Sequence, residues 1–391
     1  MKICVFTDQH LGYRQYSQEE REQDFYDVFN QVVRAMIKEQ PDLIINGGDI
    51  FHTKNPSPRA INQFQQGLDL IDVPVLSIIG NHTTAKIRNF FPSDKLFDLY
   101  FLEDKPFISE DLFIAGVNYR PILEFNDLIN KINDLAVQAQ DYKKRILVLH
   151  QGLEDDFPFG FEIPRGAIDY SKWDIVIVGH IHNRMYRVDP SGCQILYPGS
   201  TARSSTAEAQ DEMKNGKGYS IIDTDTMKIH NVSLPMPRRF IFIEVDQEDL
   251  EDEILKVEDS LDGDLLFITM TGENSNYGFD LIDQYNLKGK CLRVDYNFID
   301  TNPITIQEEV IQTDDDGNAI IPSAGEILFE TVKEKYDEDT ANYAVSLMNI
   351  FQDGTQEAFE EAKLLSEKFI INRKRIPPPL QVEDEFCKFS R

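Results

Sequence analysis

The pattern of apolar and polar residues along the chain is dominated by short, continuously apolar runs that stop at polar residues. Five runs have the length and the β-branched content of strands buried on both faces. Each is followed within a few residues by carboxylate, amide or imidazole side chains. The runs and their polar ends are 2–6 with Asp8 and His10, 43–45 with Asp49, 75–79 with Asn81 and His82, 145–149 with His150, and 174–178 with His180 and His182. In open α/β sheets the ligand site lies beyond the carboxyl ends of the strands, so we expect these side chains to meet.

Amphipathic helical patterns separate these strands. Apolar residues recur at i, i+3 and i+4 between 25 and 37, with Ser17 and Glu20 at capping-box spacing before them. A second helix is expected to begin with Ser57 as N-cap and Pro58 at the first helical position. Further patterns predict a hairpin over 107–117, a helix over 123–139 and a closing hairpin over 219–232. Alternating strands and helices predict a layered α/β domain.

The chain changes character after a proline- and arginine-rich linker near 235–239. Beyond it, strands and helices are expected to alternate between 240 and 296, which predicts a small second α/β domain. Residues 300–324 have the composition of an acidic loop, and amphipathic helices follow from 325. The predicted organisation is therefore a main domain over 1–236, a smaller domain over 239–324 and a C-terminal helical arm with its tail over 325–391.

The positions of the histidines set the main domain apart. Of seven histidines, five stand at the strand ends and a sixth, His52, lies three residues after Asp49. One such histidine would be unremarkable, whereas six in one pattern indicate a shared role. The seventh, His230, fits no pattern and is interpreted as structural.

Composition limits the remaining possibilities. The net charge is −29, and most of it lies beyond residue 240, where 13 Lys and Arg face 35 Asp and Glu. The basic stripe of a typical DNA-binding protein is absent, yet the nearly neutral main domain tolerates a polyanionic substrate if cations are bound there. Four widely spaced cysteines suit a reducing, cytoplasmic location. No apolar run is long enough to span a membrane, and a cleaved leader is not expected because its removal would delete Asp8 and His10.

The residue types at the strand ends suit two divalent cations. Asp49 is the expected bridge, because a carboxylate has two oxygens to share. Asp8, His10 and His182 would complete one ion, and Asn81, His150 and His180 the other. Such a mixed set of oxygen and nitrogen ligands favours Mn²⁺ or Fe²⁺. Two adjacent cations are suited to phosphoester hydrolysis by in-line attack of water, with His82 as the candidate that stabilises or protonates the leaving oxygen.

The order Asp-x-His, Gly-Asp, Gly-Asn-His, a single His and Gly-His-x-His resembles the calcineurin-like metallophosphoesterase superfamily. More narrowly, the chain resembles the SbcD-type nuclease of double-strand-break repair complexes. The residues that carry this narrower resemblance are the segments 48–52, 150–152 and 197–200, together with the second domain and the helical arm.

This resemblance implies an α/β/β/α sandwich with a small capping domain that positions DNA. It implies an enzyme with two metal ions, Mn²⁺ above all, that acts as a double-strand exonuclease and single-strand endonuclease in DNA repair, recombination or replication. It also implies a role for His52 near the scissile phosphate, a homodimer formed through the nuclease domain, and an SbcC-type coiled-coil ABC ATPase bound by the helical arm.

One residue departs from the family pattern. Thr83 stands where the family has an acidic residue after Gly-Asn-His, so a carboxylate that would orient His82 is missing. This predicts weaker intrinsic catalysis or greater dependence on the partner. Two alternatives stay open: a metallophosphoesterase for phosphoproteins or small nucleotides, and a metal-binding scaffold that regulates an ATPase.

Overall fold

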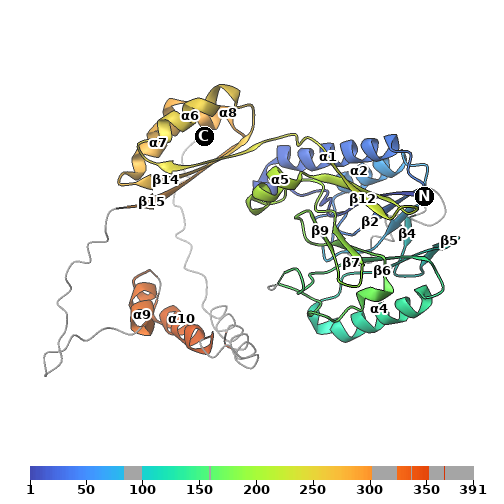
Figure 1. The fold of residues 1–391 in the computed structure, drawn as a ribbon. Coiled ribbons are helices and arrows are strands. Elements are labelled where there is room, and N and C mark those ends of the chain that lie inside the picture. Colours follow the sequence, from blue (N-terminus) through green and yellow to red (C-terminus); the bar gives the residue numbers. More distant parts are fainter. Residues whose placement is uncertain (83–98, 158–159, 302–323, 336, 352–364, 366–391) are drawn as a thin grey trace, which may run out of the picture. The chain divides into compact units, whose positions relative to one another are not determined.

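A computed structural model of the chain describes residues 1–82, 99–157, 160–301, 324–335, 337–351 and 365 (Figure 1). The chain divides into two compact units, Met1–Thr301 and Asn302–Arg391. Within the described ranges, no helix combines the length and the apolar character that a membrane span requires.

Two six-stranded sheets form the centre of the first unit. In the first sheet, β1 pairs in parallel with β2 and antiparallel with β11. Its strands, in spatial order, are β12 (Lys228–Ser233), β11 (Gly218–Asp223), β1 (Lys2–Phe6), β2 (Leu43–Asn46), β3 (Val75–Ser77) and β4 (Leu99–Phe101). The second sheet contains, in order, β5 (Phe107–Ser109), β6 (Leu112–Val117), β7 (Lys144–His150), β8 (Ile175–Gly179), β10 (Gln194–Tyr197) and β9 (Met185–Val188). The strands β1, β2 and β3, which precede predicted ligands, are neighbours in one sheet, and β7 and β8 are neighbours in the other.

Helices cover the outer faces of the two sheets (Figure 1). Helices α1 (Glu19–Lys38) and α2 (Pro58–Leu68) lie against the first sheet, and α4 (Phe125–Ala139) lies against the second. Fully buried aliphatic side chains from both sheets, such as Ile3, Leu43, Ile146 and Ile177, form one core between them. This arrangement confirms the expected α/β/β/α sandwich.

The starts of the first two helices show where the sequence-based expectation succeeded and where it was wrong. At α2 the Ser57 hydroxyl accepts a hydrogen bond from the Ala60 amide at 3.1 Å, as predicted for an N-cap. The capping box at Ser17 and Glu20 is wrong, because α1 begins at Glu19 and its N-cap position is Gln18. Ser17 belongs to a preceding 3₁₀ turn and has a φ of 61°, which is not the extended conformation of an N-cap residue.

A third, three-stranded sheet follows β12 in the chain. It is parallel throughout, with β14 (Leu265–Gly272) between β13 (Phe240–Asp246) and β15 (Arg293–Asp300). The helices α6 (Leu250–Val257), α7 (Ser275–Gln284) and α8 (Leu287–Lys290) enclose a separate core that includes Ile243, Ile254, Ile268 and Leu281. These elements agree with the small second α/β layer predicted after the linker.

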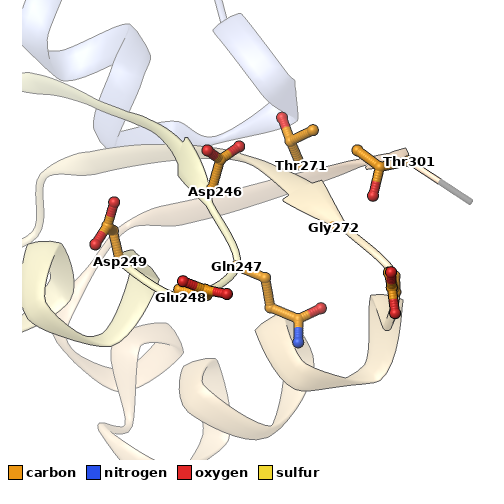
Figure 2. Close-up of a pocket in the computed structure, with 8 residues that line it drawn as sticks. Asp246, Gln247, Glu248, Asp249, Thr271, Gly272 and Thr301 are labelled. Atoms are coloured by element: carbon orange, nitrogen blue, oxygen red, sulfur yellow. The ribbon is translucent and has the colours of Figure 1, made fainter.

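A hollow of about 520 Å³ lies at the carboxyl edge of this third sheet (Figure 2). Four of the residues that line it are acidic: Asp246, Glu248, Asp249 and Glu273. The loops that end β13 and β14 form its walls, and their acidic side chains give the hollow a negative charge.

In the second unit, α9 (Ala324–Lys335) and α10 (Glu338–Phe351) pack against each other. They match the first two helices expected for the C-terminal arm. The acidic loop over 302–323, the third expected helix after Gly354 and the proline-rich tail lie outside the described residues. The proposed boundaries at 236–239 and 324–325 remain predictions.

Candidate metal centre

The loops that leave β1 and β2 run side by side and bring the first predicted ligands together. The Asp8 amide donates to the Gly48 carbonyl at 3.0 Å, and the His10 amide donates to the Asp49 carbonyl at 3.1 Å. The strands β7 and β8 end at His150 and Gly179 opposite these loops. As a result, all seven predicted ligands gather at one edge of the two sheets.

Four of these seven residues have a left-handed backbone. The φ angles are 54° at Asp8, 46° at His10, 47° at Asp49 and 81° at His180. Such a conformation costs on the order of 1 kcal/mol or more for a residue that is not glycine, and it persists only when its surroundings hold it. The conformation of these loops therefore lowers the stability of the fold, and it directs the four side chains toward a common position.

Close packing around Asp49 leaves no room for side chains on the neighbouring glycines. A Cβ atom on Gly80 would lie 2.6 Å from His150 Nε2 and would collide with the Asp49 carboxylate. A Cβ on Gly48 would lie 2.5 Å from His150 Nδ1. The glycines that precede Asp49 and Asn81 are thus required by the closeness of the ligands.

Asp8, His10 and His182 form the first group of candidate ligands. The Nε2 atoms of His10 and His182 face each other at 3.0 Å, and they lie 3.9 and 3.8 Å from Asp8 Oδ1. Asp8 Oδ1 is buried and has no hydrogen-bond partner among the described residues. A buried carboxylate oxygen without a partner is costly, and two imidazole nitrogens at this distance are arranged to share a cation.

Asn81, His150 and His180 form the second group. His150 Nδ1 donates to the Gly47 carbonyl at 2.8 Å, and its Nε2 lies 3.1 Å from Asp49 Oδ2 and 3.2 Å from Asn81 Oδ1. His180 Nδ1 lies 3.1 Å from the same amide oxygen. Oxygens of Asp8 and Asp49 lie within 4.8 Å of His150 and of each other. Asp49 therefore stands next to both groups, where a bridging ligand would have to be.

The buried imidazoles of the cluster differ in their pKa values. Burial, together with His182, holds the pKa of His10 well below its usual range. Burial and His150 lower the pKa of His180 to about 3. Burial opposes ionisation of Asp49, but the adjacent His150 outweighs it and keeps the pKa of Asp49 low. Burial disfavours the charged forms of His150 and His182 as well, but their carboxylate neighbours outweigh it. Asp49 and Asp8 raise the pKa of His150 to about 9, and the hydrogen bond to Glu208 raises the pKa of His182. A bound cation would displace the additional proton of each of these two rings. Neutral imidazoles beside an ionised carboxylate are then the donor set that a divalent cation needs, so the residues present fit such ions.

His82 and His52 lie next to this cluster. The His82 amide donates to Asp49 Oδ1 at 2.9 Å, and its ring Nδ1 donates to the His52 carbonyl at 2.8 Å. The ring of His52 is stacked between His82 and Tyr13, with centroids 5.2 and 3.8 Å away. Burial and His82 lower the pKa of His52 to about 4. Thr83 lies outside the described residues, and the His52 carbonyl supplies an acceptor for His82 Nδ1.

The sequence analysis did not identify three polar residues around His182. His182 Nδ1 lies 2.7 Å from Ser204 Oγ and 3.1 Å from Glu208 Oε1, and Lys217 is in turn bonded to Glu208. The turn at 197–200 approaches the centre as expected, because the Ser200 amide donates to the His182 carbonyl at 3.0 Å. An acidic residue soon after that turn was the one available signal for Glu208.

The sequence of the chain is similar to that of a phosphoesterase family and of several DNA repair proteins. Residues 1–184 match the family described as calcineurin-like phosphoesterase. The chain is 28% identical to the DNA double-strand break repair protein Mre11 of Methanocaldococcus jannaschii, over 77% of this chain and 84% of that protein. It is 30% identical to the Mre11 protein of Sulfurisphaera tokodaii, over 67% of this chain and 70% of that protein. Among solved structures, a dimetal phosphatase from Danio rerio matches 56% of this chain and 91% of its own, with 12% identity and a TM-score of 0.41.

Proposed function

The chain belongs to the Mre11 family of calcineurin-like phosphoesterases, and we propose that it is a DNA nuclease that hydrolyses phosphodiester bonds with two divalent cations. The observation that carries this proposal is the convergence of seven oxygen and nitrogen donors from five strand ends, in a family whose curated members are named for DNA double-strand break repair. Phosphodiesters are the substrates that two adjacent cations and a neighbouring imidazole are suited to cleave.

In this proposal Asp8, His10 and His182 hold one cation, Asn81, His150 and His180 hold the other, and Asp49 is shared. When bound, such a pair polarises the phosphoryl group and lowers the pKa of water. Mn²⁺ is the proposed ion, because the mixed carboxylate, amide and imidazole set suits it better than a thiolate-selecting metal. The left-handed loops keep the donors in place before the substrate arrives, which reduces the cost of reorganisation.

His82 is the proposed proton donor to the leaving oxygen, through Nε2. Its Nδ1 donates to the His52 carbonyl, which remains an acceptor whether or not Nε2 carries a proton. The ring orientation is thus fixed while the proton moves. His52, held by stacking on Tyr13, is the proposed neighbour of the scissile phosphate.

Binding of a polyanion to so acidic a chain needs a local positive charge. Bound cations supply it, because two divalent ions add +4 to the charge of residues 1–240, which hold 26 Lys and Arg against 33 Asp and Glu. Binding of DNA near the scissile phosphate is therefore expected to depend on the metal.

The partners that we propose for the chain are based on its family and on the helices of its second unit, Asn302–Arg391. We propose that the helices α9 and α10 contribute to an arm that binds an SbcC-type ABC ATPase, and that the sandwich forms a homodimer. Double-strand exonuclease and single-strand endonuclease activities in repair, recombination or replication complete the proposal.

The test is degradation of end-labelled linear duplex DNA with Mn²⁺, alone and with the ATPase, beside the variant Asp49→Asn. This variant keeps the shape of the side chain, and asparagine tolerates the left-handed φ of 47° at this position. We expect label release by the wild-type chain and a loss of at least about 100-fold in the variant, because ligand and bridge are lost together.

Other outcomes would favour the alternatives. Hydrolysis of small phosphodiesters without any cleavage of DNA would indicate a different phosphoesterase. A chain that hydrolyses neither substrate, with or without the ATPase, would indicate a metal-binding scaffold.

A further inference from the structure

A buried carboxylate lies behind His182, on the side away from the other candidate ligands. Glu208 Oε1 is 3.1 Å from His182 Nδ1. The Ser204 hydroxyl lies 2.7 Å from the same ring nitrogen and donates to Glu208 Oε1 at 2.5 Å, and the Ser204 amide donates to that oxygen at 3.2 Å. His182 Nε2, at the opposite corner of the ring, faces His10 and Asp8. The imidazole of His182 therefore lies between the Glu208 carboxylate on its Nδ1 side and the proposed metal position on its Nε2 side.

Lys217 forms a buried ion pair with the other oxygen of this carboxylate, Glu208 Oε2. Its side chain is only 1% exposed, and that of Glu208 is 5% exposed. The ammonium donates to Glu208 Oε2, to Ser200 Oγ at 2.7 Å and to the His182 carbonyl at 2.8 Å, so all three of its hydrogens have acceptors. A buried lysine is costly unless it is paired, and here it fixes both the backbone of His182 and the group that contacts its ring.

We propose that Glu208, held by Lys217, is a positioning residue that keeps the proton of His182 on Nδ1. The Nε2 lone pair is then always directed at Asp8 and His10, and the network sets the affinity of that cation position. The inference rests on the metal centre proposed above and deepens it, because it assigns a dedicated support to one of the two positions.

The support is specific to His182. His150 is held by a backbone carbonyl, that of Gly47, and its orientation does not involve Glu208. His180 Nδ1 lies 3.1 Å from Asn81 Oδ1, a ligand proposed for the same cation. Loss of Glu208 should therefore weaken the cation position of Asp8, His10 and His182 and spare the position of Asn81, His150 and His180.

The experiment is calorimetric titration of the metal-free, full-length chain with Mn²⁺ in the absence of DNA. For the wild type we expect two bound ions. In Glu208→Gln the amide cannot accept from His182 and satisfy Lys217 at the same time, so one ion should bind about 10- to 100-fold more weakly while the other is unchanged. The matched control is Glu212→Gln, a carboxylate of α5 (Ala209–Asn215) that pairs with Arg203 and, in the part of the chain that the structure describes, with none of the proposed ligands. It should leave both affinities as they are.

A double substitution separates positioning from general destabilisation. Lys217→Met should weaken the same ion, and Glu208→Gln with Lys217→Met should weaken it by less than the sum of the two single changes, because both disturb the bond between Glu208 and His182. Titration with Co²⁺, followed by its visible absorption, checks which ion is lost.

Unchanged Mn²⁺ affinities in Glu208→Gln, or equal weakening of both ions, would overturn the inference. A wild-type chain that binds no Mn²⁺ would overturn the metal centre itself, whereas failure to cleave DNA would leave these titrations intact.

Discussion

At the scale of single residues, the centre is built by side chains that accept an unfavourable backbone in order to converge. Asp8, His10, Asp49 and His180 all have positive φ angles. Asparagine visits this region more easily than most residues, so Asp→Asn changes remove a charge at little conformational cost. Alanine at the same positions would add backbone strain to the loss of a proposed ligand, so a fall in activity would have two possible causes.

The proposed role of His82 as a proton donor can be tested with two substrates whose leaving groups differ in their need for a proton. In His82→Asn, cleavage of DNA should fall by about 100- to 1,000-fold, because the leaving alkoxide then lacks a proton donor. Hydrolysis of bis(4-nitrophenyl) phosphate should fall far less, because nitrophenolate leaves without a proton. Steady-state rates with both substrates at saturating Mn²⁺ give the comparison.

The matched control for this prediction is Mn²⁺ affinity, which should not change because His82 is not among the proposed ligands. Equal loss of rate on both substrates would show that His82 acts on metal binding or on the fold, and not as a proton donor.

Sequence alone anticipated that the proposed ligands lie close together, because a polar residue after a buried strand has only one edge of the sheet to occupy. It did not anticipate the residues behind them. Glu208 comes from the segment after β10 and Lys217 directly precedes β11, so their meeting depends on the closing hairpin that pairs β11 with β1. No local spacing encodes such a contact.

At the scale of elements, the first two helices begin in different ways although both are preceded by a serine. Ser57 has an extended backbone and its hydroxyl caps α2. Ser17 has a left-handed backbone and lies in the 3₁₀ turn before α1, so its hydroxyl is not a cap. In both places the sequence offered a serine at the position of a helix N-cap. Only Ser57 became the cap, because Ser17 is part of the 3₁₀ turn that precedes α1.

This difference predicts unequal effects of two similar substitutions. Ser57→Ala should lower the free energy of unfolding by about 1 kcal/mol, because the Ala60 amide loses its acceptor. Ser17→Ala should change it by less than about 0.5 kcal/mol, as expected for an exposed position without a cap. Urea unfolding followed by circular dichroism measures both. Similar losses in the two variants would contradict the assignment of the caps.

At the scale of the whole molecule, the charge is unevenly distributed. The hollow at the edge of the third sheet is lined by four carboxylates and has the wrong sign for DNA phosphates (Figure 2). Contacts of the third sheet with DNA are thus expected elsewhere on its surface. The sequence predicted the excess of acidic residues in this region, but it did not predict that the loops after β13 and β14 would bring four of them together.

The hydrophobic cores predict which part of the chain is autonomous. Among the described residues, the four clusters of buried apolar side chains contain residues of Met1–Thr301 alone. A chain ending at Thr301 should therefore bind two Mn²⁺ ions and hydrolyse bis(4-nitrophenyl) phosphate within about twofold of the full chain. It should not be captured by an SbcC-type ATPase, because the proposed arm is gone.

A second truncation, after Phe351, keeps α9 and α10 and serves as the control for this last prediction. If these two helices carry the binding surface, the longer chain is captured by the immobilised ATPase and the shorter chain is not. Capture of both truncated chains would place the partner on the first unit and contradict the arm. Capture of neither would assign the surface to residues beyond 351, because the part of the arm that packs as α9 and α10 would then be insufficient.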